Sequence, residues 1–368
     1  MKNNSVVRIC CAIPSLQAGG MERVMSELIN AFIQYENTEV HVVLFGKDPE
    51  VFYKIDSKVI VHKPAFQFNN KIRFASTIRT LFYLRKEISK IAPSTVLSFG
   101  NLWNTFVLLS CVGKRYPIFI SDRGTPLYKA GKFQEFLKKK LYPQSAGIVA
   151  QTLKAKAIYQ QDFPKANFTV IGNPIRNIEI SENNQREKII VSVGRLIKTK
   201  HYDRMIKLFA ELNRSDWKLV IVGGDAQNQN NMAKLQAQLA EMGNPENIEL
   251  AGTQKDVERY LLRSSIFAFT SSSEGFPNVV GEAMSAGLPV VSYDCVAGPS
   301  DMIVDGENGY LVPVFDDELF KQRLLELMND ETKREAMGKK AKETIKRFEL
   351  NYIVERFYRF ITENNGRH

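Results

Sequence analysis

No apolar run in this chain of 368 residues is long enough to cross a bilayer. The longest candidate, residues 105–112, is about half of the roughly 18–20 residues that a spanning helix needs. Arg8 lies inside the first apolar stretch and no small-residue cleavage site follows it, so we expect no signal peptide. The four cysteines form no CxxC pair, and we expect reduced thiols in a cytoplasmic protein.

Other common motifs are also missing. The glycines near the N-terminus do not form the pattern GxGxxG, and no P-loop follows any expected strand, which disfavours a dinucleotide-binding protein and an NTPase. The four histidines are scattered, and no metal-ligand spacing is present. No helix-turn-helix, RNP-like strand or zinc finger supports a nucleic-acid-binding protein, the first rival function from another class.

Charge is unevenly distributed along the chain. The net charge is +10, yet residues 1–170 alone carry +13 and residues 171–368 carry −3. An excess of Lys and Arg in one half is typical of a protein that meets a polyanion: nucleic acid, anionic lipid headgroups or a phosphorylated substrate.

Short apolar runs alternate with segments of helical periodicity, as in residues 21–34, where apolar side chains recur every three or four positions. Such alternation predicts α/β domains whose parallel sheets are covered by helices. The pattern restarts after a polar stretch at residues 181–187, and Pro174 forces an extended backbone before it. The expected strands are residues 6–13, 40–45, 59–61, 95–99, 118–121, 147–150, 188–193, 217–222, 248–250, 266–270 and 289–292.

We therefore expect two Rossmann-like domains, residues 1–172 and 173–350. Residues 351–368 carry apolar side chains at helical spacing, and we expect this segment to form a helix that docks back on the first domain. Residues 298–309 are predicted to be a loop and a hairpin that lead into a strand at residues 310–312.

Three segments can carry chemistry. The run AGGMER at residues 18–23 places Gly19 and Gly20 between the first strand and its helix, where backbone can approach a ligand and the helix N-terminus favours an anion. A tight turn without a ligand is the alternative. The run VGRLIKTK at residues 193–200 aims Arg195 and Lys200 at one edge of the second sheet, as a departing diphosphate requires. Solvated surface charge is the alternative.

The third segment, SSSEGFPNVVGE at residues 271–282, holds two carboxylates. Glu274 is expected in a loop after a strand, and Glu282 in the helix that follows, eight residues later. A carboxylate accepts several hydrogen bonds and therefore suits the vicinal diols of sugars and of ribose. Surface charge is the alternative for either residue alone.

At these residues the sequence resembles the family 4 glycosyltransferases, whose GT-B fold has two Rossmann-like domains facing each other across a cleft. The sharpest match is the family signature E-x7-E, here Glu274 to Glu282, and nearly the whole chain takes part. The runs GGMER, VGRL with Lys200, and DGENGYLV at residues 305–312 resemble family motifs in the same order.

The resemblance implies roles for these residues. Glu274 would contact the transferred sugar, Glu282 the donor ribose, and Arg195 and Lys200 the departing diphosphate. The Gly19–Gly20 loop would lie against the donor phosphates or the acceptor. The family retains anomeric configuration and normally needs neither metal nor cofactor. The expected donor-binding residues are Gly20, Gly194, Gly275, Phe276, Asn278, Val279 and Glu282.

The sequence departs from the family at two places. Many relatives have Ser-Glu-His or Ser-Glu-Arg after a late strand of the first domain, whereas this chain has Ser121, Asp122 and Arg123. Asp122 and Arg123, with Gly19, are the candidates for the acceptor side. Asp301 also stands where Glu is more common.

Two basic amphipathic helices can account for the excess of positive charge in the first half of the chain. Residues 71–90 and 133–142 interleave apolar side chains with Lys and Arg, including Lys138, Lys139 and Lys140. Such helices suit an anionic membrane surface, although two ordinary helices with solvated basic faces would have the same pattern. The acceptor domain of the fold is usually the N-terminal one, so we expect a polyprenyl-diphosphate-linked acceptor at the cytoplasmic face of a membrane.

The sequence thus predicts a retaining hexosyltransferase that moves a hexose or N-acetylhexosamine from a nucleotide sugar, with UDP as the expected nucleotide, in bacterial polysaccharide, O-antigen or glycan biosynthesis. Alternatives within the fold are a transferase acting on a soluble or simple lipid acceptor, a nucleotide-sugar epimerase and a glycogen-type synthase. A non-catalytic sugar- or polyanion-binding protein is the remaining alternative, disfavoured because all four signature side chains are present.

Overall fold

The computed structural model describes residues 6–47, 50–181 and 185–363. Two compact units share the chain: residues Met1–Pro174 with Leu350–His368, and residues Ile175–Glu349. The crossing between Pro174 and Ile175 lies beside the predicted boundary. Residues 182–184 of the polar stretch and residues 364–368 of the terminal segment lie outside the described residues.

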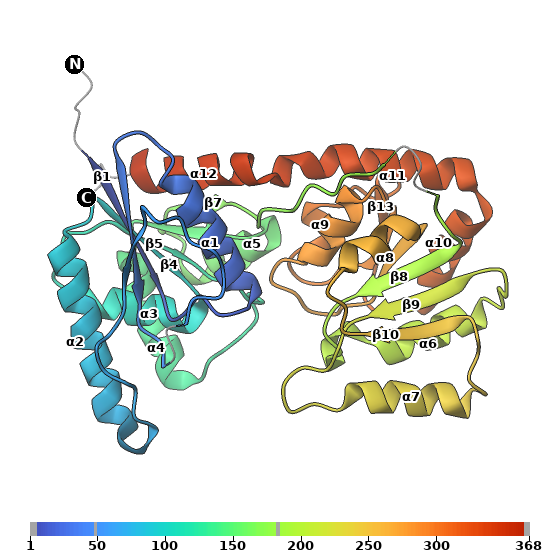
Figure 1. Ribbon diagram of the computed structural model, residues 1–368, viewed down its shortest axis with the longest axis horizontal. Coiled ribbons are helices and arrows are strands. Elements are labelled where there is room, and N and C mark those ends of the chain that lie inside the picture. Colours follow the sequence, from blue (N-terminus) through green and yellow to red (C-terminus); the bar gives the residue numbers. More distant parts are fainter. Residues whose placement is uncertain (1–5, 48–49, 182–184, 364–368) are drawn as a thin grey trace. The chain divides into compact units, whose positions relative to one another are not determined.

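The first unit is built on a seven-stranded sheet in the order β3-β2-β1-β4-β5-β6-β7, with every pair parallel (Figure 1). The order in which strands are added to the sheet reverses between β1 and β4. Ile9 in β1 pairs with Val40 of β2 on one side and with Thr95 of β4 on the other. Ligands bind at such a switch point, outside the carboxyl ends of the strands. The strands are β1 Val7–Ile13, β2 Thr38–Leu44, β3 Ile60–His62, β4 Thr95–Phe99, β5 Ile118–Ser121, β6 Gly147–Ala150 and β7 Phe168–Val170.

Helices of the first unit bury their apolar stripes against this sheet. In α1, Val24, Leu28 and Phe32 recur every four residues and are fully buried, as the periodicity predicts. Helix α3 packs against both α2 and α4, so these three form one layer. The helices are α1 Gly20–Phe32, α2 Arg73–Ile91, α3 Asn101–Ser110, α4 Lys132–Leu141 and α5 Leu153–Asp162, with 3-10 turns η1 Asn70–Ile72 and η2 Tyr142–Gln144.

The terminal helix α12 (Leu350–Glu363) belongs to the first unit, and Figure 1 shows it beside α1. Its aromatic side chains make the contact: Phe357 lies 6.0 Å from Phe99, and the Tyr358 ring stacks on Tyr35 at 3.9 Å. The Tyr358 hydroxyl also lies 2.9 Å from the Thr38 hydroxyl at the start of β2. One face of this helix therefore completes the core of the first unit.

The second unit repeats the plan with a six-stranded parallel sheet in the order β10-β9-β8-β11-β12-β13. Its strands are β8 Ile189–Val193, β9 Lys218–Val222, β10 Ile248–Gly252, β11 Ile266–Phe269, β12 Val290–Tyr293 and β13 Gly309–Val312. Its helices are α6 Tyr202–Glu211, α7 Asn231–Glu241, α8 Val257–Arg263, α9 Asn278–Ser285, α10 Asp317–Asn329 and α11 Glu331–Ile345, with 3-10 turns η3 Lys198–Lys200, η4 Pro299–Asp301 and η5 Lys346–Phe348.

The prediction of a hairpin before β13 is wrong. Strand β13 pairs with β12 in parallel, with Val290 opposite Gly309. The segment between the two strands includes η4. It forms a crossover, which returns the chain from the carboxyl end of β12 to the amino end of β13.

Glycines at the carboxyl ends of two neighbouring strands of the second sheet have backbone angles that other residues avoid. Gly194 follows β8 with φ of 151°, and Gly223 follows β9 with φ of 155°. A Cβ atom on Gly223 would lie 1.9 Å from the Gly194 carbonyl oxygen, so the two loops touch through their backbones. The candidate site lies at this carboxyl edge of the second sheet.

Candidate functional site

The loop after β8 presents the two predicted cations of the second unit. Arg195 is exposed, and its guanidinium forms no hydrogen bond or ion pair with a side chain among the described residues. Lys200 closes η3, and its side chain packs against Gly194, where an added Cβ would lie 3.3 Å from Lys200 Cε and 2.9 Å from the Tyr202 hydroxyl. Gly194 therefore leaves room for Lys200 to reach the sheet edge.

Lys200 and Glu274 form an ion pair at this edge. Lys200 Nζ donates to Glu274 Oε1 at 2.7 Å, and both side chains are mostly buried, with exposures of 12% and 15%. The Ser271 hydroxyl donates to the same carboxylate oxygen at 2.6 Å. A carboxylate and an ammonium from two neighbouring strands, β11 and β8, are thus held together where a ligand can meet both.

Hydroxyl groups tie the loop after β11 to the loop after β8. The amide of Ser272 donates to the Thr199 carbonyl at 2.9 Å, and the Thr270 hydroxyl donates to the Lys200 carbonyl at 2.7 Å. His201, in the left-handed region with φ of 50°, places Nε2 2.8 Å from the Ser272 hydroxyl. The sequence interpretation missed Ser271, Ser272 and His201, although the run of hydroxyl residues before Glu274 was a visible signal.

Helix α9 carries the second glutamate of the signature. Glu282 is half-buried about one turn into the helix, and its carboxylate has no protein partner among the described residues. Pro277 stands at the N-cap and no side chain caps the first turn. The Asn278 amide donates to the Phe276 carbonyl at 3.0 Å, so the amide of Val279 is the one left at this helix end. Glu282 and this helix end are therefore both available for polar groups of a donor.

One of the predicted donor-binding residues, Phe276, also has a structural contact. The Phe276 ring is buried and packs 5.6 Å from Phe348, which leaves its backbone as the part that a ligand could meet. Gly275, between Glu274 and Phe276, is half-buried. The loop around Gly298 packs on the start of α9, since an added Cβ there would lie 2.1 Å from Pro277 Cδ.

In the first unit, Gly19 lies against groups of its own unit. Its φ of −169° is ordinary extended backbone. An added Cβ would lie 2.2 Å from Glu22 Oε2, so Gly19 leaves room for a carboxylate of its own chain. The Tyr53 hydroxyl lies 3.1 Å from the Gly19 amide and donates to its carbonyl at 2.9 Å. Gly20 begins α1, and no side chain caps that helix.

Arg123 lies at the carboxyl end of β5 and reaches across the sheet edge. Its Nη2 donates to Asn173 Oδ1 at 2.7 Å, which also accepts a hydrogen bond from Gln151 at 2.9 Å. Its guanidinium stacks on the Phe99 ring at 4.2 Å. Burial and the nearby Arg23 lower the pKa of Arg123 to about 9. This side chain remains a candidate for contact with a ligand.

Asp122 does not fit the acceptor-side prediction. Its side chain is buried and accepts hydrogen bonds from Asn104 at 2.8 Å, Tyr142 at 2.6 Å and Lys138 at 2.9 Å. Burial, with Asp122 beside it, raises the pKa of the Tyr142 hydroxyl, which therefore stays a donor. The carboxylate is saturated inside the unit and fixes the loop that carries Arg123.

The prediction that Lys138 belongs to a solvent-facing basic run is wrong. Its side chain is 7% exposed and pairs with Asp122, while Lys139 and Lys140 are exposed. A residue in α4 whose neighbours along the chain are exposed can still face inward, because successive helical residues point about 100° apart. Through this ion pair, Lys138 links α4 to the carboxyl end of β5.

Replacing Lys138 by methionine should lower the free energy of unfolding by about 3–5 kcal/mol, because Asp122 would keep a buried charge without its cation. Urea unfolding followed by circular dichroism measures this loss. The neighbouring exposed Lys139→Met should leave the midpoint unchanged, and Lys138→Met with Asp122→Asn should recover part of the loss. A Lys138→Met midpoint equal to that of Lys139→Met would refute a stabilising pair.

Two general features of the described residues complete the chemical picture. They hold no group of three or more His, Cys, Asp or Glu side chains arranged to bind a metal ion. Within the same residues, no helix combines the length and apolarity that crossing a membrane requires. The cysteines Cys10, Cys11, Cys111 and Cys295 are free and buried, and burial raises the pKa of each thiol.

Relatives with assigned activities cover almost the whole chain. A Campylobacter jejuni enzyme named GalNAc-alpha-(1->4)-GalNAc-alpha-(1->3)-diNAcBac-PP-undecaprenol alpha-1,4-N-acetyl-D-galactosaminyltransferase is 26% identical over 97% of this chain and 99% of its own length. The lipopolysaccharide 1,6-galactosyltransferase of Salmonella typhimurium is 29% identical over 80% of this chain and 81% of its own length.

Solved structures share the fold. The lipopolysaccharide outer core galactosyltransferase WaaB in its apo form has a TM-score of 0.78 with 22% identity, covering 97% of this chain and 99% of its own. The Anabaena protein Alr3699/HepE in complex with UDP has a TM-score of 0.80 with 15% identity, covering 97% of this chain and 100% of its own.

Two family models divide the chain between them. The model for Glycosyltransferase Family 4 matches residues 18–176, and the model for Glycosyl transferases group 1 matches residues 175–344. They meet where the chain passes from the first unit to the second. This chain is therefore a member of the family 4 glycosyltransferases, with their GT-B fold of two Rossmann-like domains.

Proposed function

We propose that this glycosyltransferase moves a hexose or N-acetylhexosamine from a UDP-sugar to a saccharide carried on a polyprenyl diphosphate, with retention of anomeric configuration. The ion pair between Lys200 and Glu274 is the observation that carries the proposal, because it joins the two charges that the reaction needs. Support for the acceptor comes from two Campylobacter jejuni relatives whose names specify undecaprenyl-diphosphate-linked substrates.

The chemistry assigns a task to each charged side chain. The bond between the anomeric carbon and the diphosphate oxygen breaks while the acceptor hydroxyl forms its own bond to that carbon. Arg195 and Lys200 stabilise the negative charge that gathers on the departing UDP. Glu274 accepts hydrogen bonds from hydroxyls of the transferred sugar, and Glu282 accepts them from the ribose. Retention follows when the hydroxyl attacks from the face that UDP leaves, and the departing oxygen takes the hydroxyl proton.

The reaction should not depend on a divalent metal. Arg195 and Lys200, with the uncapped start of α9, supply the positive charge that a metal would otherwise provide. Initial rates of transfer in buffer with EDTA should equal those with added Mg²⁺ or Mn²⁺. A rate that disappears with EDTA and returns with one of these ions would overturn this part of the proposal.

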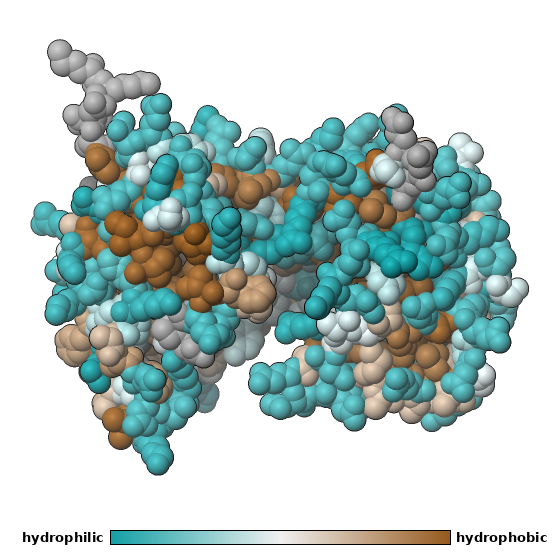
Figure 2. Space-filling model, in the orientation of Figure 1, coloured by the Kyte–Doolittle hydropathy of each residue, from teal (hydrophilic) through white to brown (hydrophobic). Residues whose placement is uncertain are grey.

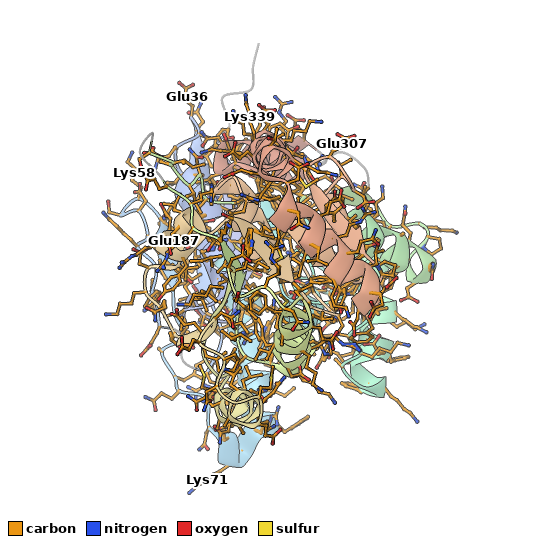
Figure 3. The ribbon with its side chains drawn as sticks, turned by 90° about the vertical axis from the view of Figure 1, so that its right-hand side faces the viewer. Glu36, Lys58, Lys71, Glu187, Glu307 and Lys339 are labelled. Carbon is orange, nitrogen blue, oxygen red and sulfur yellow. The ribbon has the colours of Figure 1, made fainter. Side chains whose placement is uncertain are left out.

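The first unit presents a surface suited to a membrane that carries the acceptor, which we call the membrane face. On α2, Phe74, Ile78 and Phe82 are exposed at intervals of four residues, and Phe74 is 81% exposed. Figure 2 shows apolar side chains among hydrophilic ones near the end of this helix, and Figure 3 shows Lys71 pointing outward there. On α4, Phe133 is 73% exposed. The exposed cations of these two helices and of the turn η1 before α2 are Lys71, Arg73, Arg79, Lys86, Lys90, Lys132, Lys139 and Lys140.

Aromatic rings beside Lys and Arg bind anionic bilayers by inserting the rings while the cations attract headgroups. The layer of α2, α3 and α4 brings these side chains into one unit of the fold. We therefore propose that the protein acts as a peripheral enzyme at the cytoplasmic face of a membrane.

Replacing Phe74 and Phe82 together by serine should weaken partitioning onto phosphatidylglycerol-rich vesicles about tenfold or more, since each buried aromatic ring contributes up to about 1.5–3 kcal/mol. Vesicle sedimentation measures the bound fraction. The matched control is Tyr352→Ser, which removes a half-exposed ring from α12 without touching the membrane face. Unchanged partitioning of the double variant, or an equal loss in the control, would contradict the assignment.

The donor is tested by incubating the purified protein with UDP-, GDP- and ADP-sugars and measuring both slow hydrolysis and thermal stabilisation. One UDP-sugar should stand out in both measurements, and its product should have the same anomeric configuration by NMR. Stabilisation only by GDP- or ADP-sugars would overturn the choice of nucleotide, and an inverted product would overturn retention.

A further inference from the structure

Two residues with disfavoured backbone angles meet beside the ion pair of Lys200 and Glu274. His201 has φ of 50° and Phe315 has φ of 70°, in the left-handed region that residues with a Cβ atom rarely adopt. Their rings are in contact, edge to face, with centroids 5.0 Å apart. A residue with a large side chain keeps such a conformation only where its surroundings require it, and these positions gather at functional sites. The contact is therefore a candidate for a role beyond the fold.

His201 is connected to both halves of the ion pair. It directly follows Lys200, whose carbonyl accepts a hydrogen bond from the Thr270 hydroxyl at 2.7 Å. Its ring atom Nε2 lies 2.8 Å from the hydroxyl of Ser272, which stands two residues before Glu274. One residue thus joins the backbone on the Lys200 side to the loop on the Glu274 side.

Phe315 holds the imidazole from a third loop, the one that follows β13. Its ring contacts His201 and also Arg204, whose guanidinium stacks on it at 4.6 Å. Arg204 in turn pairs with Asp317 at 3.1 Å, two residues after Phe315. The Phe315 ring is 48% exposed, so burial of apolar surface does not by itself explain its position. The ring is held by two neighbours and limits the movement of His201.

The imidazole of His201 is neutral at pH 7. Burial lowers its pKa from the ordinary value; Asp203 opposes this shift, while Arg204 and Lys198 act in the same direction as burial. A neutral imidazole has one N–H and one lone pair, so it can form the hydrogen bond with Ser272 without adding a charge to the site. Such a group is suited to positioning rather than to charge stabilisation.

We propose that His201, held by Phe315, is a positioning residue for the transfer reaction, which keeps Lys200 and Glu274 in the arrangement that meets the departing diphosphate. The proposal rests on the function proposed above, since it takes this ion pair as the transfer site. The pair acts on charge that develops in the transition state, and a displaced pair stabilises that charge less. Loss of the imidazole should therefore lower kcat more than it raises the KM of the donor.

His201→Gly separates the imidazole from the backbone angle. Glycine adopts the left-handed conformation without strain, so the turn should remain and the melting temperature should stay within a few degrees. The contact with Ser272 is lost, and kcat should fall about tenfold, the size of one net hydrogen bond. The KM of the donor should change less than about threefold, because the ground state depends less on the pair.

Two further variants show whether the imidazole or the turn is responsible. His201→Asn tolerates the same backbone angle and keeps both a donor and an acceptor, so it should recover part of kcat. Asn213→Gly is the matched control, since Asn213 is an exposed residue of the same unit with φ of 51°. This control should leave kcat unchanged.

Phe315→Gly tests the contact between the rings. It removes the ring and the strained angle together, so the melting temperature should fall by no more than a few degrees. Its kcat should fall by no more than that of His201→Gly. Because both side chains act on the same ion pair, the double variant should be no slower than His201→Gly alone. Losses that multiply would overturn the part of the proposal that concerns Phe315.

A measurement without substrate separates this inference from the proposed function. The coupling between Lys200→Met and Glu274→Gln in urea unfolding reports on the ion pair itself, and it should fall by about half or more in the His201→Gly background. An unchanged coupling, or a kcat of His201→Gly equal to that of Asn213→Gly, would overturn the positioning role. If the unchanged protein turns over no UDP-sugar, the proposed function fails, while the unfolding cycle still decides whether His201 positions the pair.

Discussion

Glu274→Ala should abolish measurable transfer, with a loss of at least about 10²–10³ in rate, because removing one transition-state contact in a pre-arranged site has an effect of this size. Glu274→Gln should lose a similar factor, since an amide cannot match the charge of the carboxylate next to Lys200. The rate is measured as UDP release with the donor that the sugar panel identifies.

The fold should survive these changes. Lys200 would lose its partner, which costs stability, yet the loops stay tied by the bonds of Thr270 and Ser272 to the opposite loop. We expect the melting temperature of Glu274→Gln to fall only by several degrees. Glu307→Ala, an exposed glutamate of the same unit that Figure 3 labels at its surface, is the control and should retain full activity.

Arg195→Ala should have the second largest effect, a loss of UDP affinity of roughly 10- to 100-fold together with the loss of transfer, as expected for charged hydrogen bonds to a diphosphate. Its melting temperature should stay unchanged, because the exposed guanidinium has no side-chain partner among the described residues. Isothermal titration with UDP measures the affinity.

Arg259→Ala is the matched control, since it removes an exposed arginine of the same unit and the same net charge. Its UDP affinity should equal that of the unchanged protein at physiological salt, where charges more than about 8 Å apart are largely screened. Turnover retained in both Glu274→Ala and Arg195→Ala would mean that the transfer site lies elsewhere.

Much of the fold is predictable from local patterns. Strands β4, β5 and β6 have the predicted bounds, because each is a short buried apolar run with polar or turn residues on either side. Strand β7 was missed, since Phe168–Val170 is three half-buried residues that look like any loop. A strand at the edge of a sheet is defined by its neighbour, and the neighbour is not visible in a window of the sequence.

The candidate site likewise has some features that the sequence predicts and others that it does not. The spacing of Glu274 and Glu282 predicted a loop carboxylate followed by a helical one, and the structure has this arrangement. The pair of Lys138 and Asp122 could not be predicted, because it joins a helix to a strand end and depends on which face of α4 turns inward. The closeness of Gly19 to the Glu22 carboxylate could not be predicted either, because it depends on the direction of the Glu22 side chain. That this loop meets a ligand stays a prediction.

Because α12 returns to the first unit, the second unit is an insertion within the first and does not simply follow it along the chain. Residues 175–349 form one uninterrupted segment, so they could be exchanged between relatives as one piece. The first unit cannot be obtained by stopping the chain at residue 174, because the aromatic side chains of α12 would be lost from its core. A short bridge from residue 174 to residue 350 would be the natural way to produce that unit alone.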